Sequence, residues 1–150
     1  MSNYDSRLTV HGSHFKVKGF LFSGISAGIK KDGEKDLGLI YSEVPAQVAG
    51  VFTTNRVKAA PVLIDQKRIR QGLCQAILVN SGNANACTGP QGLKDCYTLS
   101  SILSRELKIS QKHILLASTG VIGTPLPTEK IINKIPELMR NLSPEGWMDV

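Results

Sequence analysis

The sequence predicts an α/β protein, a mixed-sheet α/β sandwich in which antiparallel N-terminal strands precede a βαβ unit. Short apolar runs separated by glycine, proline and charged turns fill the first third of the chain. A long stretch of helical periodicity, residues 91–107, then lies between two short apolar runs, 75–79 and 113–117. With 150 residues, 41% of them apolar, the chain predicts a single domain, 1–150, with its own core.

The first third is expected to be a β-meander. Residues 1–14 form a polar lead-in, which we expect to be flexible. Residues 16–28 predict one or two strands, and Asp32-Gly33 lies at the centre of a charged hairpin connector. The β-branched and aromatic content of 37–44 and 47–54 predicts two antiparallel strands joined by a tight turn.

After Pro61 the periodicity changes. Apolar residues among charged ones over 62–70 predict a short helix, with Pro61 near its start and Gly72 as its stop. The run at 75–79 predicts a strand. Residues 80–90 are too polar and too rich in glycine for either element, and they predict a loop.

The helix over 91–107 has the strongest pattern in the chain, because apolar residues recur along it at three- and four-residue spacing. Thr88 and Gln91 have the spacing of a capping box at its start. A last helical region begins near Thr128, and Pro136 inside it predicts a kink or a break into two short helices.

The strand–helix–strand order predicts a parallel strand pair whose carboxyl ends lie at the same edge of the sheet. The loops 80–89 and 118–123 would then open on one side, where ligands bind in such sheets. Thr119 and Gly120 are our catalytic candidates, because a small hydroxyl and a glycine N–H suit the stabilisation of an oxyanion. A second set is expected either to bind substrate or to shape the cleft: Asn80, Asn83, Asn85 and Ser118.

Composition argues against several other functions. The net charge of +6 comes from scattered Lys and Arg residues without interleaved aromatics, so we expect no nucleic-acid partner. Without a membrane span or a secretion signal, the chain is expected to be cytoplasmic, with no membrane partner. The three cysteines, Cys74, Cys87 and Cys96, include no C-x-x-C pair and are expected to be reduced and buried.

No cofactor or metal is expected. The loop that precedes Gly92-Leu93-Lys94-Asp95 lacks the Gly-Lys-Ser/Thr ending of a P-loop. The histidines, His11, His14 and His113, have no Cys or carboxylate partner at ligand spacing. No base accompanies a cysteine, so the thiols are expected to be structural rather than nucleophilic. The nucleophile that would complete an acyl-transfer site must come from elsewhere.

Four groups of residues carry a resemblance to a known family. They are Gly19-Phe20 with Ser23-Gly24 and Ala27-Gly28-Ile29-Lys30, the run AGVFTTNRVKAAP at 49–61, the run NSGNANACTG at 80–89 and the run STGVIG at 118–123. These motifs are long and specific, and they resemble the ornithine acetyltransferase family of arginine biosynthesis, the bifunctional glutamate N-acetyltransferases. The resemblance covers the chain from about Gly19 to its end.

The resemblance implies a multifunctional enzyme with a fold like that of the N-terminal-nucleophile hydrolases, assembled as an α₂β₂ heterotetramer. Family members are precursors that cut themselves before an internal threonine, which becomes the N-terminal residue of the β chain. This threonine takes the acetyl group from N-acetylornithine and passes it to glutamate, and acetyl-CoA stays open as a further donor. Thr119 and Gly120 match the motif that forms the family's oxyanion hole.

The cleavage motif and the nucleophilic threonine of the family lie downstream of these residues. We therefore expect the chain to be most of an α chain, with the β chain as its partner, and to be inactive alone. Two alternatives stay open: a non-catalytic binding or assembly domain, and a subunit of an aminopeptidase-like enzyme with an N-terminal nucleophile.

Overall fold

The computed structural model describes residues 16–150, so the lead-in predicted for 1–14 lies outside the described residues. Four strands form one sheet in the order β1-β2-β3-β4. They are β1 (Phe20–Ile25), β2 (Leu37–Gln47), β3 (Leu73–Asn80) and β4 (Ile114–Ser118). β1, β2 and β3 are antiparallel neighbours, whereas β3 and β4 are parallel. The helix α2 (Gly89–Leu107) connects the parallel pair, which confirms the mixed sheet and the βαβ unit.

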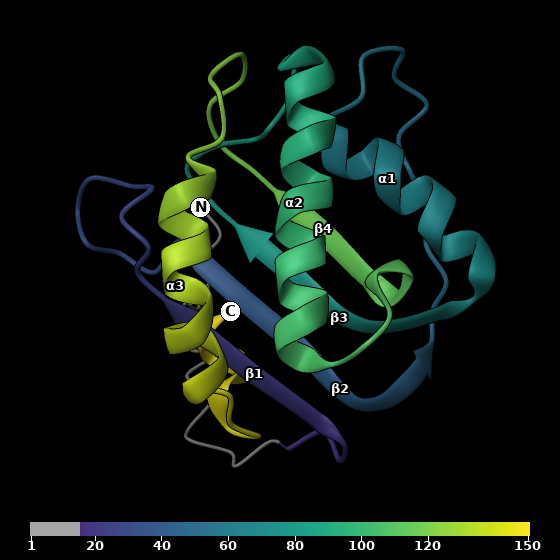
Figure 1. The fold of residues 1–150 in the computed structure, drawn as a ribbon, viewed down its shortest axis with the longest axis vertical. Helices are drawn as coiled ribbons and strands as arrows, with labels where there is room; N and C mark the ends of the chain where they lie inside the picture. The colour runs from purple at the N-terminus through teal and green to yellow at the C-terminus, as the bar shows by residue number, and fades with distance from the viewer. Residues whose placement is uncertain (1–15) are drawn as a thin grey trace, which may run out of the picture.

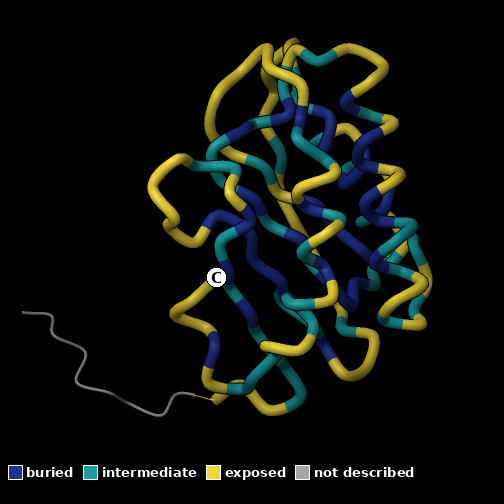
Figure 2. Tube along the Cα trace, turned by 60° about the vertical axis from the view of Figure 1, so that its left-hand side comes forward, coloured by how far each residue is buried: buried dark blue, intermediate teal, exposed yellow. Residues whose placement is uncertain are grey.

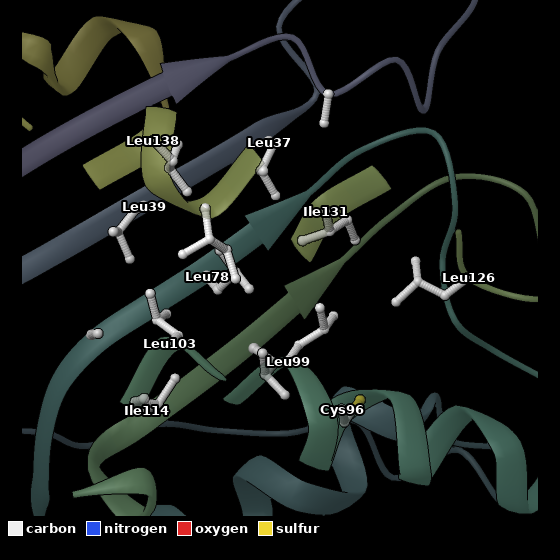
Figure 3. Packing of buried hydrophobic residues seen from close by; sticks show 14 of the residues in the cluster. Leu37, Leu39, Leu78, Cys96, Leu99, Leu103, Ile114, Leu126, Ile131 and Leu138 are labelled. Atoms are coloured by element: carbon white, nitrogen blue, oxygen red, sulfur yellow. The ribbon is translucent and has the colours of Figure 1, made fainter. Parts of the chain in front are cut away.

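Helices cover one face of this sheet. α2 and α3 (Thr128–Arg140) lie across it, and α1 (Ala60–Arg68) lies beyond β4 (Figure 1). Three short 3₁₀ segments complete the described elements: Ile69–Gln71, Gln111–His113 and Gly146–Asp149. The core lies between the sheet and these helices, where six apolar side chains are 0% exposed: Ile135 and, labelled in Figure 3, Leu39, Leu103, Ile114, Ile131 and Leu138. Burying each contributes about 1.5–3 kcal/mol to folding.

The opposite face of the sheet is only partly covered. Phe22, Ile40 and Ile77 are register partners on three neighbouring strands. Because side chains alternate along a strand, these three point away from the core. Their side chains, and that of Val79, are half-buried. The C-terminal segment reaches one edge of this region, where Ser143 and Phe22 exchange two backbone hydrogen bonds of 2.9 Å. Buried positions therefore follow the strands and the inner helix surfaces, and exposed ones lie mainly in the connections and on the outer helix surfaces (Figure 2).

The strand predicted over 47–54 is wrong. β2 instead continues through Pro45 to Gln47, and residues 48–59 contain no strand. The pairing of β2 with β3 shifts register between Tyr41 and Ala46, and an irregularity of this kind accommodates the missing N–H of Pro45. Beyond it the chain leaves the sheet, and Val51 is 99% exposed.

The two predicted helix signals also need correction. Thr88 precedes α2 but makes no side-chain cap, because its hydroxyl donates to Asn85 Oδ1 at 2.8 Å instead. Gln91 bonds Asp95 Oδ1 at 2.7 Å rather than reaching back to Thr88. Of the two outcomes expected at Pro136, the break into two short helices is wrong, because α3 is one helix that contains this proline. Its buried apolar face outweighs the penalty of about 3 kcal/mol for an internal proline.

Candidate functional site

The loops 80–89 and 118–123, called the site loops below, lie side by side at the carboxyl edge of the parallel strands (Figure 1). Asn80 and Ser118 form the last register pair of β3 and β4. Beyond the strands the two loops continue to pair, since Ala84 N donates to Val121 O at 2.9 Å and Val121 N to Gly82 O at 3.3 Å. The prediction that both loops open on one side of the sheet is confirmed.

Gly120 allows the site loops to approach this closely. Its φ of +130° lies in a region that favours glycine. A Cβ at this position would lie 2.3 Å from the carbonyl carbon of Gly82 and 2.5 Å from the nitrogen of Asn83. Because those atoms are backbone, a side chain at residue 120 has no room unless the two loops separate.

Asn80 and Ser118 join the loops through their side chains. The Ser118 hydroxyl donates to Asn80 Oδ1 at 2.6 Å, and Asn80 Nδ2 donates to the carbonyl oxygen of Asn83 at 2.8 Å. Asn80 is buried, so both ends of its amide are used inside the protein.

Asn83 and Asn85 hold the interior of the longer loop. Asn83 Oδ1 accepts the N–H of Asn85 at 2.8 Å, and its Nδ2 donates to the carbonyl oxygens of Thr124 and Pro125, each at 3.1 Å. The Asn85 side chain is 0% exposed, and its Nδ2 donates to Gly92 O at 3.0 Å in the first turn of α2. Asn85 also has a φ of +45°, a conformation that asparagine tolerates better than most residues. These amides therefore bond to groups within the protein.

Thr119 and Gly120 are placed differently. Both are exposed, and the Thr119 N–H is already donated to Asn80 O at 3.0 Å. The Thr119 hydroxyl and the Gly120 N–H form no hydrogen bond with another described residue. The end of β4 thus presents two adjacent donors on a backbone that is fixed by the neighbouring loop.

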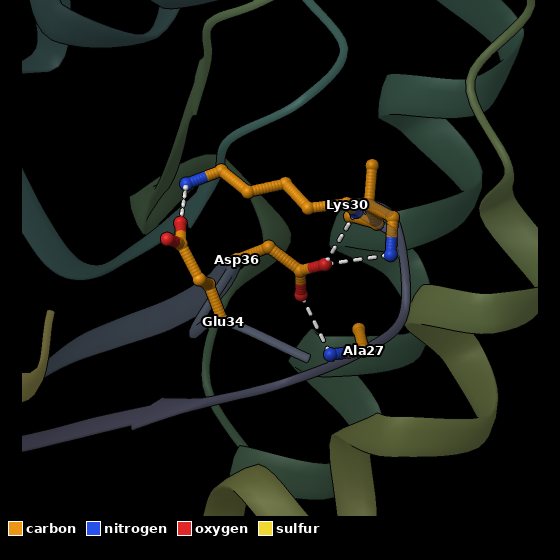
Figure 4. Close-up of polar contacts among 5 residues, drawn as sticks. Ala27, Lys30, Glu34 and Asp36 are labelled. Atoms are coloured by element: carbon orange, nitrogen blue, oxygen red, sulfur yellow. Dashed lines mark hydrogen bonds and ion pairs between the residues drawn. The ribbon is translucent and has the colours of Figure 1, made fainter. Parts of the chain in front are cut away.

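Sequence reasoning missed Asp36, which supports the site loops from a third segment. Its carboxylate accepts the N–H groups of Ala27 and Ile29 at 2.6 Å and of Lys30 at 2.8 Å (Figure 4). Its carbonyl oxygen accepts the N–H of Ser81 at 2.9 Å. An aspartate just before a strand is a signal for such bonding, but the partners lie six to nine residues away and no local pattern predicts them.

The thiols differ from the prediction at one position. Cys74 and Cys96 are buried, and burial raises the pKa of both thiols, that of Cys96 to about 12. Cys87 is exposed, however, and it has a φ of +57° in the loop just before α2. Among residues 16–150 no group of three or more His, Cys, Asp or Glu is placed to hold a metal ion, and His11 and His14 lie outside that range.

Within the described range no helix has both the length and the apolar character that crossing a membrane requires.

Comparison with known proteins identifies relatives of most of the described region. The family model of the ArgJ family matches residues 21–149. The arginine biosynthesis bifunctional protein ArgJ of Geobacter sulfurreducens is 53% identical over 126 residues, which are 84% of this chain and 32% of that protein. The protein of the same name from Caldanaerobacter subterraneus is 52% identical over 132 residues, 88% of this chain and 32% of its own length. The chain thus spans about a third of these curated relatives.

Two crystal structures share the fold. Arginine biosynthesis bifunctional protein ArgJ from Bacillus halodurans superposes with a TM-score of 0.83 at 42% identity, over 91% of this chain and 73% of that one. Ornithine acetyltransferase from Mycobacterium tuberculosis, a complex with ornithine, gives a TM-score of 0.87 at 35% identity, over 95% and 77% of the two chains. From its motifs, its fold and these matches, the chain belongs to the ArgJ family.

Proposed function

We propose that the chain is the α-chain part of an acetyltransferase that moves an acetyl group from N-acetylornithine to glutamate. One observation carries this proposal: the Thr119 hydroxyl and the Gly120 N–H are adjacent, exposed donors without a partner among the described residues. Donors fixed in this way stabilise the oxyanion that forms when a nucleophile attacks an acetyl group. Each such donor contributes about 3 kcal/mol to the transition state.

In the proposed reaction the nucleophile is the N-terminal threonine of a β chain cut from the same precursor. Its hydroxyl oxygen attacks the acetyl carbon of N-acetylornithine, the C–N bond breaks, and ornithine leaves with the proton as a free amine. The amine of glutamate then attacks the acetyl-threonine ester, which yields N-acetylglutamate and restores the hydroxyl. Thr119 and Gly120 would face the carbonyl oxygen in both halves of the reaction.

Two further observations support this assignment. The structurally similar enzyme from Mycobacterium tuberculosis is named an ornithine acetyltransferase and is a complex with ornithine. The second face of the sheet also offers apolar, half-buried side chains, among them Ile40 and Ile77, on which a β chain could pack in the proposed α₂β₂ assembly. The amides of Asn80, Asn83 and Asn85 bond within the protein, which favours shaping of the cleft over direct contact with substrate.

The test is an assay of the complete enzyme that contains residues 1–150, supplied with N-acetylornithine and glutamate. We expect ornithine and N-acetylglutamate to appear in equal amounts, and the chain 1–150 alone to give neither. Release of ornithine without formation of N-acetylglutamate would instead indicate an amidase with an N-terminal nucleophile. Binding of substrate without any product would indicate a binding domain. Replacing N-acetylornithine by acetyl-CoA decides whether the enzyme has a second donor.

A further inference from the structure

Helix α1 contacts the free edge of β4 through two charged side chains. β4 is the last strand of the sheet, and its other edge pairs with β3. Both carboxylate oxygens of Asp65 accept the N–H of Leu116, at 3.1 and 3.2 Å. Arg68 Nη1 donates to the carbonyl oxygen of Ile114 at 2.6 Å. Backbone groups that an edge strand leaves unpaired are therefore bonded to side chains of α1.

The same helix also contacts the other site loop. The N–H of Ala60, at the start of α1, donates to the carbonyl oxygen of Asn85 at 3.1 Å. Downstream of the Asp65 contact, β4 ends at Ser118 and leads directly into Thr119 and Gly120. α1 is thus bonded to both segments that build the candidate oxyanion hole.

Asp65 and Arg68 occupy surroundings that do not favour charges. Asp65 is 9% exposed and Arg68 is 7% exposed. Arg68 directs its second Nη to Ser100 Oγ at 2.8 Å, and its guanidinium carbon lies 5.9 Å from the centre of the Tyr97 ring. The other ionisable groups that interact with Asp65 are Cys74 of β3 and Cys96 of α2, both buried thiols.

The ionised carboxylate therefore opposes folding at neutral pH. Burial raises the pKa of Asp65 to about 6 from 3.8, against the smaller opposing effects of the Leu116 N–H and of Arg68. Because the folded pKa is the higher one, the stabilisation from the protonated group is complete below about pH 4 and is lost as the pH rises through about 6. At pH 8 the carboxylate is therefore ionised, although burial disfavours its charge.

We infer that Asp65 and Arg68 are positioning residues, which fix β4 along its free edge and thereby align the Thr119 and Gly120 donors for acetyl transfer. This inference rests on the proposed function. An ionised carboxylate that accepts the Leu116 N–H with both oxygens restrains β4 more firmly than a neutral amide does. Small displacements of donors at a reacting centre reduce rates strongly.

The experiment compares Asp65→Asn and Asp95→Asn in the complete enzyme at pH 8. Asp95 is a matched control, because it is also a buried helical aspartate, but its carboxylate accepts from Gln91 of its own helix rather than from β4. For Asp65→Asn that remains folded at the assay temperature we expect kcat to fall about tenfold or more, with KM within about twofold. Asp95→Asn should keep kcat within about twofold.

The outcomes separate this inference from the proposed function. Loss of folding in Asp65→Asn would show a structural role and overturn the inference, as would a kcat that falls no further than that of Asp95→Asn. Thr119→Ala, measured in the same assay, reports on the proposed function. If Thr119→Ala is impaired and Asp65→Asn is not, only the positioning role fails. If Thr119→Ala has the kcat of the parent enzyme, the oxyanion assignment is wrong, and the positioning role that rests on it is wrong as well.

Discussion

The loop at 80–89 and the loop at 48–59 both follow a strand and both consist largely of small and polar residues, but they are held very differently. Asn85 is fully buried and bonds α2, whereas Asn55 in the other loop is exposed and accepts only the N–H of Val57, at 3.0 Å. Val51 in the second loop is 99% exposed. Loops of similar composition therefore differ in their contacts: one is held by buried hydrogen bonds, and the other has few contacts.

The difference bears on the proposed catalytic role of the site loops. Long-range hydrogen bonds from β4, α1 and α2 fix the backbone of these loops, so in the proposed reaction the donors at Thr119 and Gly120 would not have to be ordered on substrate binding. The 48–59 loop has an exposed apolar side chain in Val51 and another in Val57.

The largest expected effect comes from adding one methyl group to each loop. Gly120→Ala places a Cβ against the backbone of Gly82 at 2.3 Å, and we expect it to destabilise the protein by about 3 kcal/mol or more. Gly50→Ala meets only the terminal Cδ1 of Ile69, at 2.8 Å, and this atom can move, so less than about 1 kcal/mol is expected. Denaturant unfolding measures the free energy of unfolding of both variants. Equal losses in the two would contradict the claim that the site loops are held more tightly than the 48–59 loop.

A smaller effect is expected when the asparagines are truncated. Asn85→Ala removes bonds to Gly92, Cys96 and Thr88 inside the protein, and should cost about 2–4 kcal/mol of unfolding free energy. Asn55→Ala removes one exposed local bond and should cost less than about 0.5 kcal/mol. Urea unfolding followed by circular dichroism measures both. If Asn85→Ala loses no more unfolding free energy than Asn55→Ala, the Asn85 amide is not required to hold the loop.

Features of the fold that depend on local sequence pattern could be predicted. The βαβ unit follows from helical spacing between two buried runs, and Gly72 ends the α1 region in a left-handed conformation with φ +70°. The strand over 47–54 failed because β-branched content does not supply a pairing partner. The single helix through Pro136 depends on burial against the sheet, which no local rule contains.

The place where the two site loops meet was predictable from the sequence, but the contacts that hold these loops were not. Parallel strands bring the ends of β3 and β4 together, so the neighbourhood of Thr119 followed from topology. The contribution of Asp36 and that of Asp65 depend on contacts 9 and 51 residues away in the chain. Such pairings are decided by the tertiary fold, and the residue types alone do not indicate them.

The most direct test of the oxyanion assignment is the kcat of Thr119→Ala in the complete enzyme, with Thr119→Ser as the control that keeps the hydroxyl. Thr119 is exposed and its hydroxyl bonds no described residue, so both variants should fold with thermal midpoints near that of the parent. We expect Thr119→Ala to lower kcat by about 10²–10³ and Thr119→Ser to retain most of the activity. A folded Thr119→Ala enzyme with the parent kcat would contradict the assignment.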